Sequence, residues 1–331
     1  MFILAGKIIK IKDANPMKFH FLKYSHPFVQ IIFMVFLMLA SFLIFSFLST
    51  LLAIPLFHVD IFNLAALMND LENPKHVMVL KYLQFIQSLS LFVIPPFLFL
   101  LFYGERSSRF FGFNRSNNIT SWLSVILMMF FLVPVNNFLA QWNSNISFPG
   151  SLAALENALR NMEQSADTLT KIFLKMNSPG AYLFNMLLIA IVPALGEELT
   201  FRGVFQPLFI RWSKNVHIGI LITGFFFSFF HFQFFGFFPR WLLGVLFGYL
   251  YYWSGTIWVP MLAHFINNGM AVTAYWVMGS DKVEGNLDHI GASAGDLALY
   301  TGMLMVALSL YVFYKSQKHK PGKEVSGDGI L

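Results

Sequence analysis

The sequence predicts an all-α, polytopic membrane protein of about eight transmembrane helices, on the strength of its composition and its charge-free windows. Hydrophobic residues make up 57% of the 331 residues and charged residues only 11%. An average soluble domain has roughly 45–50% apolar and about 25% charged residues. A soluble protein of this length could not cover its surface with so few charges, so soluble and disordered classes are excluded.

Charge-free windows mark the expected spans, because about 20 apolar residues cross the hydrocarbon of a bilayer. In chain order the windows are Phe28–Phe57, Tyr82–Tyr103, Thr120–Trp142, Met176–Gly196, Asn215–Pro239, Trp241–Ser280 and Leu297–Tyr314. The window that begins at Trp241 is too long for one helix and is expected to break at Ser254–Gly255, which gives about eight spans. The first window is longer than the apolar region of a cleaved signal peptide, so we expect a transmembrane helix there instead.

Basic residues between the windows predict the orientation of the chain. If the N-terminus is inside, the inner loops and tails hold about twice as many Lys and Arg as the outer loops, and both termini are cytoplasmic. The formal net charge is +6, but the basic residues form no stripe interleaved with aromatics, so we expect no nucleic-acid partner. The chain has no Cys, which excludes disulfides, thiolate nucleophiles and cysteine-based metal sites.

The windows and loops divide the chain into five expected parts. These are a basic cytoplasmic tail (1–27), three N-terminal transmembrane helices (28–142), an extracytoplasmic loop (143–178), a core with the polar motifs (179–280), and a last loop, transmembrane helix and basic cytoplasmic tail (281–331).

Apolar residues recur at helical spacing in the loop 143–178, which predicts an amphipathic helix at the outer surface. They are Leu152, Leu155, Leu159, Met162, Leu169, Ile172 and Phe173. Such a helix either lies on the bilayer surface or acts as a lid over a site, and the sequence leaves both interpretations open.

Five ionisable residues fall inside apolar stretches, where each costs about 2.5–3.5 kcal/mol on insertion scales. They are Glu197, Glu198, Arg202, His231 and His264. If the fourth helix continues to Arg211, Glu197 lies ~21 Å from its cytoplasmic end. His231 is expected at the same depth in the fifth helix, and His264 at ~15 Å in the seventh. Three helices therefore bring polar groups to a similar depth, which predicts an intramembrane active site.

Spacing within each helix indicates which side chains can meet. Glu198 and Arg202 are four residues apart and can form an ion pair on one face. Glu197 lies about 100° around the helix from Glu198, so the two carboxylates point in different directions. His264 and Asn268 are also four residues apart and present an imidazole and an amide on one face. A carboxylate and two imidazoles at one depth are suited to activating water.

Each of these features also has a purely structural interpretation. The pair of Glu198 and Arg202 could clamp two helices, and a single His in a span often makes a hydrogen bond for packing. Asn268 could join helices in the same way. The combination of all of them at one depth favours catalysis over these separate roles.

The polar residues stand in three motifs that resemble those of the CPBP family of intramembrane proteases. Residues 197–202 (EELTFR) match its EExxxR motif, residues 227–231 (FSFFH) match FxxxH, and residues 264–268 (HFINN) match HxxxN. The family groups CAAX prenyl endopeptidases with bacterial lysostaphin-resistance-protein-A-like proteins and with bacteriocin-processing or immunity proteins. The resemblance covers about residues 179–273, and it implies a catalytic core of this type in a bacterial inner (plasma) membrane.

The resemblance implies hydrolysis of a peptide bond in a membrane-associated protein or peptide. By that likeness, Glu197 would be the base that activates water, and His231 would help to position the water. His264 and Asn268 would stabilise the oxyanion that forms at the scissile carbonyl. CAAX-type processing and peptide maturation or immunity are both compatible with the motifs.

The resemblance further implies that Glu198 and Arg202 orient Glu197. Glu197, His231 and His264 also form a set that could hold a catalytic Zn²⁺. A carboxylate with two imidazoles can equally activate water unaided, so the residues permit both a metalloprotease and a glutamate-type protease.

Two functions of other classes remain open from the sequence. A non-catalytic membrane scaffold or immunity factor would keep these residues for packing, and a proton-coupled transporter would use them as a relay. The chain has no internal repeat of the kind found in many transporters, which argues against the second. The sequence does not indicate an oligomeric state.

Overall fold

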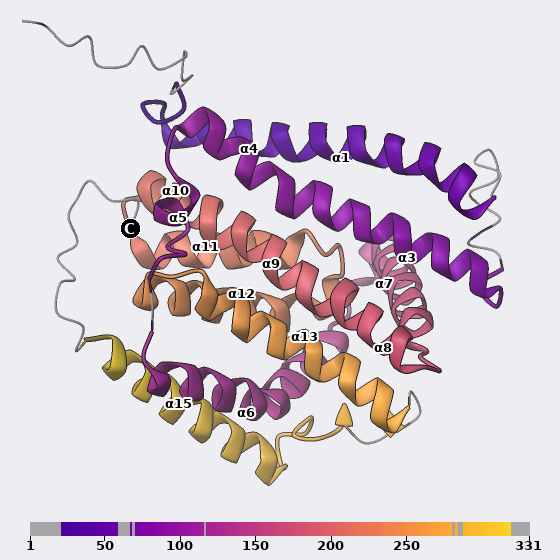
Figure 1. Cartoon of the computed structure of the whole chain (residues 1–331). Coiled ribbons are helices and arrows are strands. Elements are labelled where there is room, and N and C mark those ends of the chain that lie inside the picture. The colour runs from indigo at the N-terminus through magenta and orange to yellow at the C-terminus, as the bar shows by residue number, and fades with distance from the viewer. Residues whose placement is uncertain are drawn as a thin grey trace, which may run out of the picture.

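The computed structural model describes residues 21–58, 67, 70–115, 117–279, 282–283 and 287–318, and its regular secondary structure there is helical (Figure 1). The α-helices are α1 (Pro27–Phe57), α3 (Pro74–Ser88), α4 (Ile94–Tyr103), α5 (Ser107–Phe110), α6 (Ile119–Ser144), α7 (Ala153–Leu174), α8 (Pro179–Asn185), α9 (Val192–Glu198), α10 (Gln206–Ser213), α11 (Val216–Phe229), α12 (Phe237–Ser254), α13 (Trp258–Met278) and α15 (Leu297–Lys318). The π-helical segments are η2 (Leu89–Val93), η4 (Met186–Ile191) and η5 (Leu199–Phe205), and the 3-10 turns are η3 (Gly150–Leu152) and η6 (Phe234–Gly236).

Within the described ranges, six helical stretches are long and apolar enough to cross a membrane. They are Pro27–Phe57, Pro74–Tyr103, Ile119–Ser144, Pro179–Ser213, Phe234–Ser254 and Leu297–Gln317. α11 is apolar but has only 14 residues, and α13, with 21 residues, is not among the six. The predicted all-α membrane fold is confirmed, and the count of about eight spans is an approximation.

The helices lie side by side in layers, with the motif-bearing helices in the middle (Figure 1). α1 and the α3–α4 stretch form one outer layer, and α6 with α15 forms the opposite one. Between them lie the α8–α10 stretch, α11, α12 and α13; α10 packs on α11, and α11 on α12. This arrangement shields the motif residues on two sides.

Local sequence signals set several helix ends. Asn118, Ser178 and Asn215 cap α6, α8 and α11, because each side-chain oxygen accepts a hydrogen bond from a backbone N–H of the first turn. α4 and α12 end at Gly104 and Gly255, whose φ angles of 81° and 66° suit glycine.

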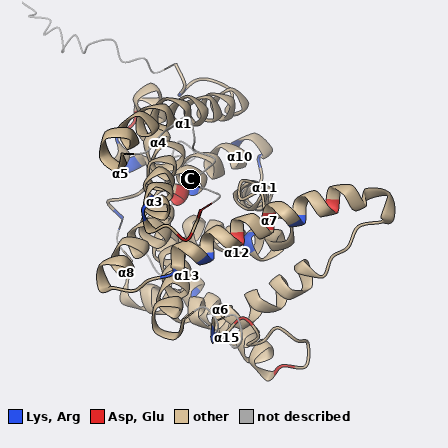
Figure 2. Ribbon diagram, turned by 90° about the vertical axis from the view of Figure 1, so that its right-hand side faces the viewer, with Lys and Arg blue, Asp and Glu red and all other residues tan. Residues whose placement is uncertain are grey.

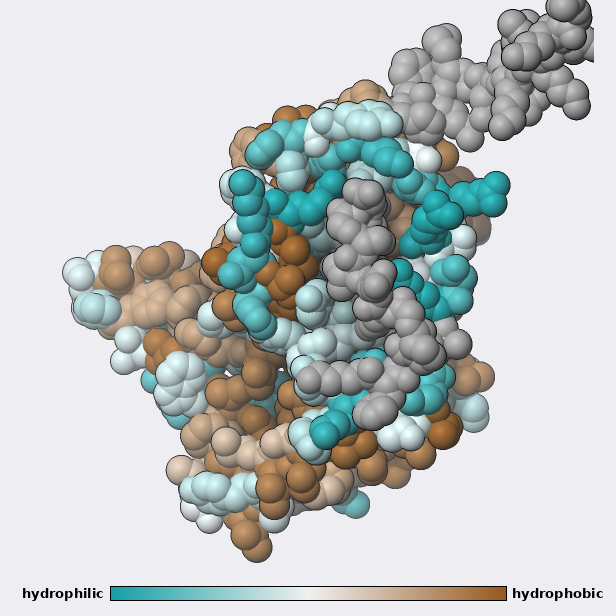
Figure 3. Space-filling view, turned by 90° about the vertical axis from the view of Figure 1, so that its left-hand side faces the viewer, coloured by the Kyte–Doolittle hydropathy of each residue, from teal (hydrophilic) through white to brown (hydrophobic). Residues whose placement is uncertain are grey.

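The outer helices expose large apolar side chains, as contact with lipid requires. On α1, the residues Phe36, Leu43 and Phe47 are 60–65% exposed, and an apolar surface of this extent would be unfavourable in water. Figure 3 views the bundle from the end near α5 and α10, where hydrophilic residues gather and hydrophobic residues flank them. This distribution fits a bundle whose sides face lipid and whose end faces water.

Two loops predicted to share one side of the membrane are in contact. Arg115 Nη1 donates to the Gly255 carbonyl over 3.1 Å, and Trp258 Nε1 donates to the Phe113 carbonyl over 3.1 Å. The contacts place the α5–α6 loop beside the α12–α13 turn. The predicted basic tails at the two ends of the chain lie largely outside the described residues.

The fifth predicted span, Asn215–Pro239, is wrong in its extent. α11 ends at Phe229, His231 lies in the turn that follows, and α12 begins at Phe237. Ser228 stabilises the turn, because its carbonyl accepts from the His231 N–H at 3.1 Å and its Oγ donates to the Phe237 carbonyl at 2.7 Å. The segment has no Lys, Arg, Asp or Glu and is mostly apolar, so hydropathy alone does not reveal the turn.

Lys81 directly precedes the predicted window Tyr82–Tyr103, which would place it in an outer loop. The structure instead buries it in α3, because that helix begins at Pro74 rather than at residue 82. Its Nζ donates to the Phe173 carbonyl and to Asn185 Oδ1, each at 2.8 Å. The lysine therefore ties the end of α7 to α3 and α8.

The amphipathic helix predicted in the loop 143–178 is present as α7 (Ala153–Leu174). Figure 2 shows α7 lying across one end of the bundle, with acidic and basic residues along its length. Its contacts with the rest of the chain include the segment that carries His231.

Candidate active site

The predicted site residues come from three neighbouring parts of the middle layer. Glu197 and Glu198 end α9, and Arg202 follows in η5. His264 and Asn268 lie on α13, and His231 lies in the turn after α11. Hydrogen bonds and ion pairs join α9, η5 and α13 directly, and aromatic contacts hold His231 beside them.

Glu198 is the centre of a buried polar network. Its Oε1 lies 2.8 Å from Arg202 Nη1 and 2.9 Å from His264 Nδ1. Glu198 and Arg202 are fully buried and the His264 side chain is 5% exposed. The predicted i, i+4 pair therefore forms, and a contact with His264 that the sequence did not indicate extends it to α13.

Glu197 faces a different part of the site from Glu198, as the helical spacing predicted. Its Oε2 lies 4.0 Å from His264 Nε2, and its side chain is 13% exposed. Oε2 is buried and accepts no hydrogen bond from the described residues. Glu198 Oε2 is also buried and accepts no hydrogen bond from the described residues, but Glu198 is fully buried and its Oε1 is engaged by Arg202 and His264. Glu197 is thus the carboxylate that is partly exposed and faces the free nitrogen of His264.

The protonation pattern of the two imidazoles follows from their partners. His264 Nδ1 faces a carboxylate oxygen and His231 Nδ1 lies 2.7 Å from the Phe227 carbonyl. Because both partners are acceptors, we assign the proton of each neutral imidazole to Nδ1. Nε2 of each ring is then an acceptor, available to a water molecule or another ligand.

Aromatic rings enclose the network. Phe247 stacks on His264 with ring centroids 5.4 Å apart, and Phe227 meets the same imidazole edge-on at 5.8 Å. The guanidinium of Arg202 lies over the Phe227 ring at 4.6 Å, which is within the range of a cation–π contact. Phe227 also contacts the His231 ring, with centroids 5.2 Å apart.

Two side chains of the α9–α10 stretch anchor it to α12. Arg202 Nη2 donates to the Gly244 carbonyl at 2.8 Å, and Gln206 Nε2 donates to the Gly248 carbonyl at 3.0 Å. A Cβ at Gly244 would lie 2.8 Å from the Cα of Gly224, so glycine permits α11 and α12 to approach this closely. Gln206 was not among the residues predicted for the site, although a polar side chain in an apolar helix was a usable signal.

Asn268 joins α13 to the helix that carries Glu197. Its Nδ2 donates to the Ile189 carbonyl at 3.0 Å. Pro193, four residues after Ile189, has no N–H to give to that carbonyl, and Asn268 supplies a donor in its place. Asn267 Nδ2 donates to Asn268 Oδ1 at 3.0 Å, which fixes the orientation of the amide.

α7 holds the segment that follows His231. Glu163 Oε2 accepts a hydrogen bond from the Phe235 N–H at 2.7 Å, and Asp167 Oδ1 accepts from Gln233 at 3.3 Å. The guanidinium of Arg160 lies 3.8 Å from the centre of the Phe235 ring. Burial raises the pKa of Glu163, and the hydrogen bond from Phe235 and the charge of Arg240 partly oppose this.

The predicted zinc ligands Glu197, His231 and His264 have suitable chemistry but are not gathered as a metal site. Both imidazoles leave Nε2 free and donate from Nδ1 to an oxygen, as metal-bound histidines do. Among the described residues, however, no group of three His, Asp or Glu side chains lies close enough to hold an ion.

Comparison with known proteins identifies the same region. Residues 179–270 match the family described as type II CAAX prenyl endopeptidase Rce1-like, so the resemblance predicted from the three motifs is confirmed over this segment. The chain is 33% identical over 103 residues to the Bacillus subtilis (strain 168) protein named uncharacterized protein YpbD. That match covers 29% of this chain and 46% of the relative, so the chain spans about half the relative's length. The comparison with solved structures found no match.

Proposed function

We propose that this chain, with its type II CAAX prenyl endopeptidase-like segment, is an intramembrane endopeptidase in which Glu197 activates water. The proposal rests on Glu197 Oε2, which accepts no hydrogen bond from the described residues, lies 4.0 Å from His264 Nε2 and, unlike the unpartnered Oε2 of the fully buried Glu198, belongs to a side chain that is 13% exposed. A buried acceptor without a partner is costly, and a substrate water would satisfy it.

The distance between the two atoms suits a bridging water. At 4.0 Å, Glu197 Oε2 and His264 Nε2 are too far apart for a direct hydrogen bond, and one water can contact both. In that position the water donates to both acceptors and turns a lone pair outward. Glu197 takes a proton as the water oxygen attacks the scissile carbonyl, and it returns that proton to the leaving amine nitrogen.

Glu198 and Arg202 act in this scheme as positioning residues. Glu198 fixes the tautomer and the orientation of His264 through Nδ1, and Arg202 compensates the buried charge of Glu198. Because Arg202 also binds the Gly244 carbonyl, the carboxylate is held against α12 as well. The network thus keeps His264 Nε2 directed at Glu197.

Asn268 is proposed to stabilise the oxyanion, whereas His264, whose Nε2 accepts from the water, positions the nucleophile. Asn268 Nδ2 carries a second hydrogen besides the one bonded to the Ile189 carbonyl. Donors directed at a developing oxyanion are typically worth about 10²–10³ in kcat.

His231 is proposed to position the substrate water from the turn after α11. Its Nδ1 bond to the Phe227 carbonyl leaves Nε2 as an acceptor. α7 holds the same segment through Glu163, which supports a role for α7 in the geometry of the site.

An apolar groove next to the site supports a membrane-associated substrate. The groove has a volume of about 530 Å³ and is lined only by apolar and aromatic residues. Ala194 and Leu195 come from the helix of Glu197, and Met261, Leu262 and Phe265 from the helix of His264. A protein or peptide that reaches the site through the bilayer would meet this groove first.

A non-catalytic scaffold accounts less well for these observations. Packing explains Glu198, Arg202 and Asn268, whose hydrogen bonds join helices. It does not explain a partly exposed Glu197 with an unsatisfied oxygen beside an imidazole.

A comparison of membrane proteomes tests the proposed function without requiring a substrate to be chosen in advance. Cells that produce the wild-type chain, Glu197→Gln or Glu72→Gln are compared by quantitative mass spectrometry of membrane peptides. Glu72 is an exposed acid outside the site and serves as the matched control. We expect at least one membrane protein to accumulate uncleaved only with Glu197→Gln. Identical peptide patterns in all three strains would contradict the proposal.

A further inference from the structure

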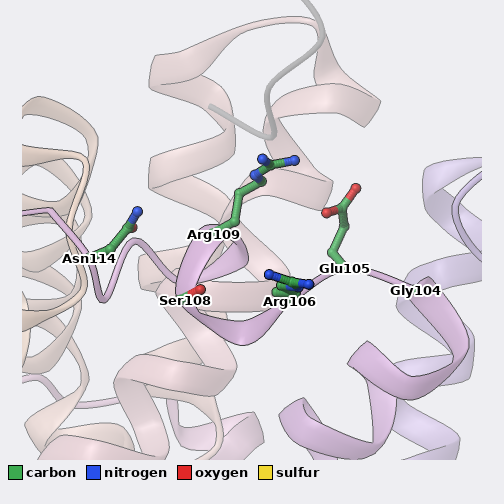
Figure 4. Close-up of a pocket in the computed structure, with 6 residues that line it drawn as sticks. All are labelled: Gly104, Glu105, Arg106, Ser108, Arg109 and Asn114. Carbon is green, nitrogen blue, oxygen red and sulfur yellow. The ribbon is translucent and has the colours of Figure 1, made fainter.

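A polar cavity lies at the turn between α4 and α5, on the predicted cytoplasmic face and away from the candidate active site (Figure 4). Its volume is about 420 Å³. The lining residues are Gly104, Glu105, Arg106, Ser108, Arg109 and Asn114. Figure 4 shows Glu105, Arg109 and Asn114 projecting to the same side of this turn.

The cavity carries an excess of positive charge. Glu105, the acid in the lining, is 2.7 Å from Lys23 Nζ, so its charge is compensated. Arg106 and Arg109 are exposed, and neither guanidinium has a hydrogen bond or an ion pair with the described residues. Two guanidinium groups that line one cavity and have no acidic partner among the described residues favour the binding of an anion there.

The cavity lies next to surface that faces the bilayer, which favours an anion that belongs to a lipid. α4 ends at Tyr103, directly before the cavity, and Leu101 on its last turn is 70% exposed. Phe21, 49% exposed, packs against Phe102 with ring centroids 6.0 Å apart. Exposed apolar residues therefore lie next to Arg106 and Arg109, where the apolar part of α4 ends. A phospholipid has the same arrangement, because its acyl chains adjoin a charged headgroup.

We propose that this cavity binds the phosphate group of an anionic phospholipid headgroup, with Arg106 and Arg109 donating to the phosphate oxygens. Guanidinium groups match phosphate geometry with paired donors, and the Ser108 hydroxyl and the Asn114 amide are further donors in the lining. The acyl chains lie along the exposed apolar residues of α4. This site is independent of peptide hydrolysis, and it would hold the α4–α5 turn at the membrane surface.

Lipid retention by the purified full chain tests the proposal. The protein is exchanged from nanodiscs of phosphatidylcholine with phosphatidylglycerol into mild detergent, and bound lipid is measured by native mass spectrometry. We expect wild type to retain phosphatidylglycerol in preference to phosphatidylcholine. The double variant Arg106→Gln/Arg109→Gln should lose that preference, with affinity for phosphatidylglycerol weaker by about thirtyfold.

Two controls keep the result specific. Lys214→Gln removes an exposed cation from the predicted cytoplasmic end of α10 and should retain lipid as wild type does. Because the exposed arginines support no packing, the double variant should also melt as wild type does. Equal retention by the double variant, or equal loss with Lys214→Gln, would overturn the proposal. Displacement of the lipid by millimolar inorganic phosphate would show that the cavity binds free phosphate, and would overturn the proposal that it binds a phospholipid headgroup.

Discussion

The Nδ1 of His264 lies 2.9 Å from the Oε1 of Glu198, so a buried hydrogen bond joins the end of α9 to α13. This contact assigns different tasks to two neighbouring carboxylates. Glu198 orients an imidazole, and Glu197 keeps an oxygen 4.0 Å from the other nitrogen of the same ring. The two glutamates therefore differ in role although they are adjacent in the chain.

Arg202→Ala should destabilise the protein strongly. It leaves Glu198 fully buried without its cationic partner, and breaking a buried pair costs on the order of 3–5 kcal/mol. Thermal melting in detergent measures the effect, with exposed Arg109→Ala as the control. A melting temperature equal to that of wild type would show that the pair does not stabilise the fold.

Asn268→Ala should lower kcat more than it lowers stability. The variant loses one hydrogen bond to the Ile189 carbonyl, worth about 1 kcal/mol, together with the proposed oxyanion donor, worth about 10²-fold or more. Kinetics with a cleaved peptide and melting of the same preparation separate the two effects. Full activity in a less stable variant would assign Asn268 to packing alone.

The thermal stability of the protein should depend on pH through Glu163, which joins α7 to Phe235. Burial raises the pKa of Glu163, so the folded protein holds this proton to a higher pH than the unfolded chain does. Stability from this group is therefore present at low pH and is lost as pH rises above about 4.3, the ordinary pKa of glutamate, through the raised value. Glu163→Gln, which keeps an acceptor for the Phe235 N–H, should show a flatter melting profile over that window. An identical pH profile in both proteins would contradict this.

The site should act without zinc. No three His, Asp or Glu side chains among the described residues gather around a common point, so we expect no stoichiometric metal in purified wild type. Chelators should leave peptide cleavage unchanged. One tightly bound ion per chain, lost with activity in His231→Ala and His264→Ala, would instead establish the zinc site predicted from the sequence.

The absence of cysteine makes the orientation directly testable. Lys214→Cys lies at the predicted cytoplasmic end of α10, and Asn161→Cys lies on α7 at the predicted outer surface. A membrane-impermeant maleimide should label only the second in intact cells and both after permeabilisation. Labelling of only Lys214→Cys in intact cells would invert the topology.

The sequence predicted the helical membrane fold because charge-free windows report directly on lipid exposure. It also indicated Glu197, Glu198, Arg202, His231 and His264, because ionisable residues are rare in such windows. The ion pair between Glu198 and Arg202 followed from helical spacing, and the structure contains it.

Features that depend on contacts distant in the sequence could not be found this way. Glu198 and His264 are 66 residues apart, and no periodic pattern reports which nitrogen faces the carboxylate. The end of α11 at Phe229 was missed because the apolar run continues beyond it. The sequence placed Lys81 in a loop because a lysine is costly to bury. In the structure its hydrogen bonds to Phe173 and Asn185, which are remote in the sequence, compensate that cost.

Glu197 is proposed as the base and Glu198 as a positioning residue, and the cleavage rates of four purified proteins distinguish the two roles. Purified wild type, Glu197→Gln, Glu198→Gln and Glu72→Gln are compared for peptide cleavage at equal amounts of folded protein, established by melting in detergent. We predict that Glu197→Gln folds as wild type does and loses at least about 10²–10⁴-fold in turnover. Glu198→Gln should be less stable and partly active, and Glu72→Gln unchanged. Wild-type turnover by folded Glu197→Gln would show that Glu197 is not the base.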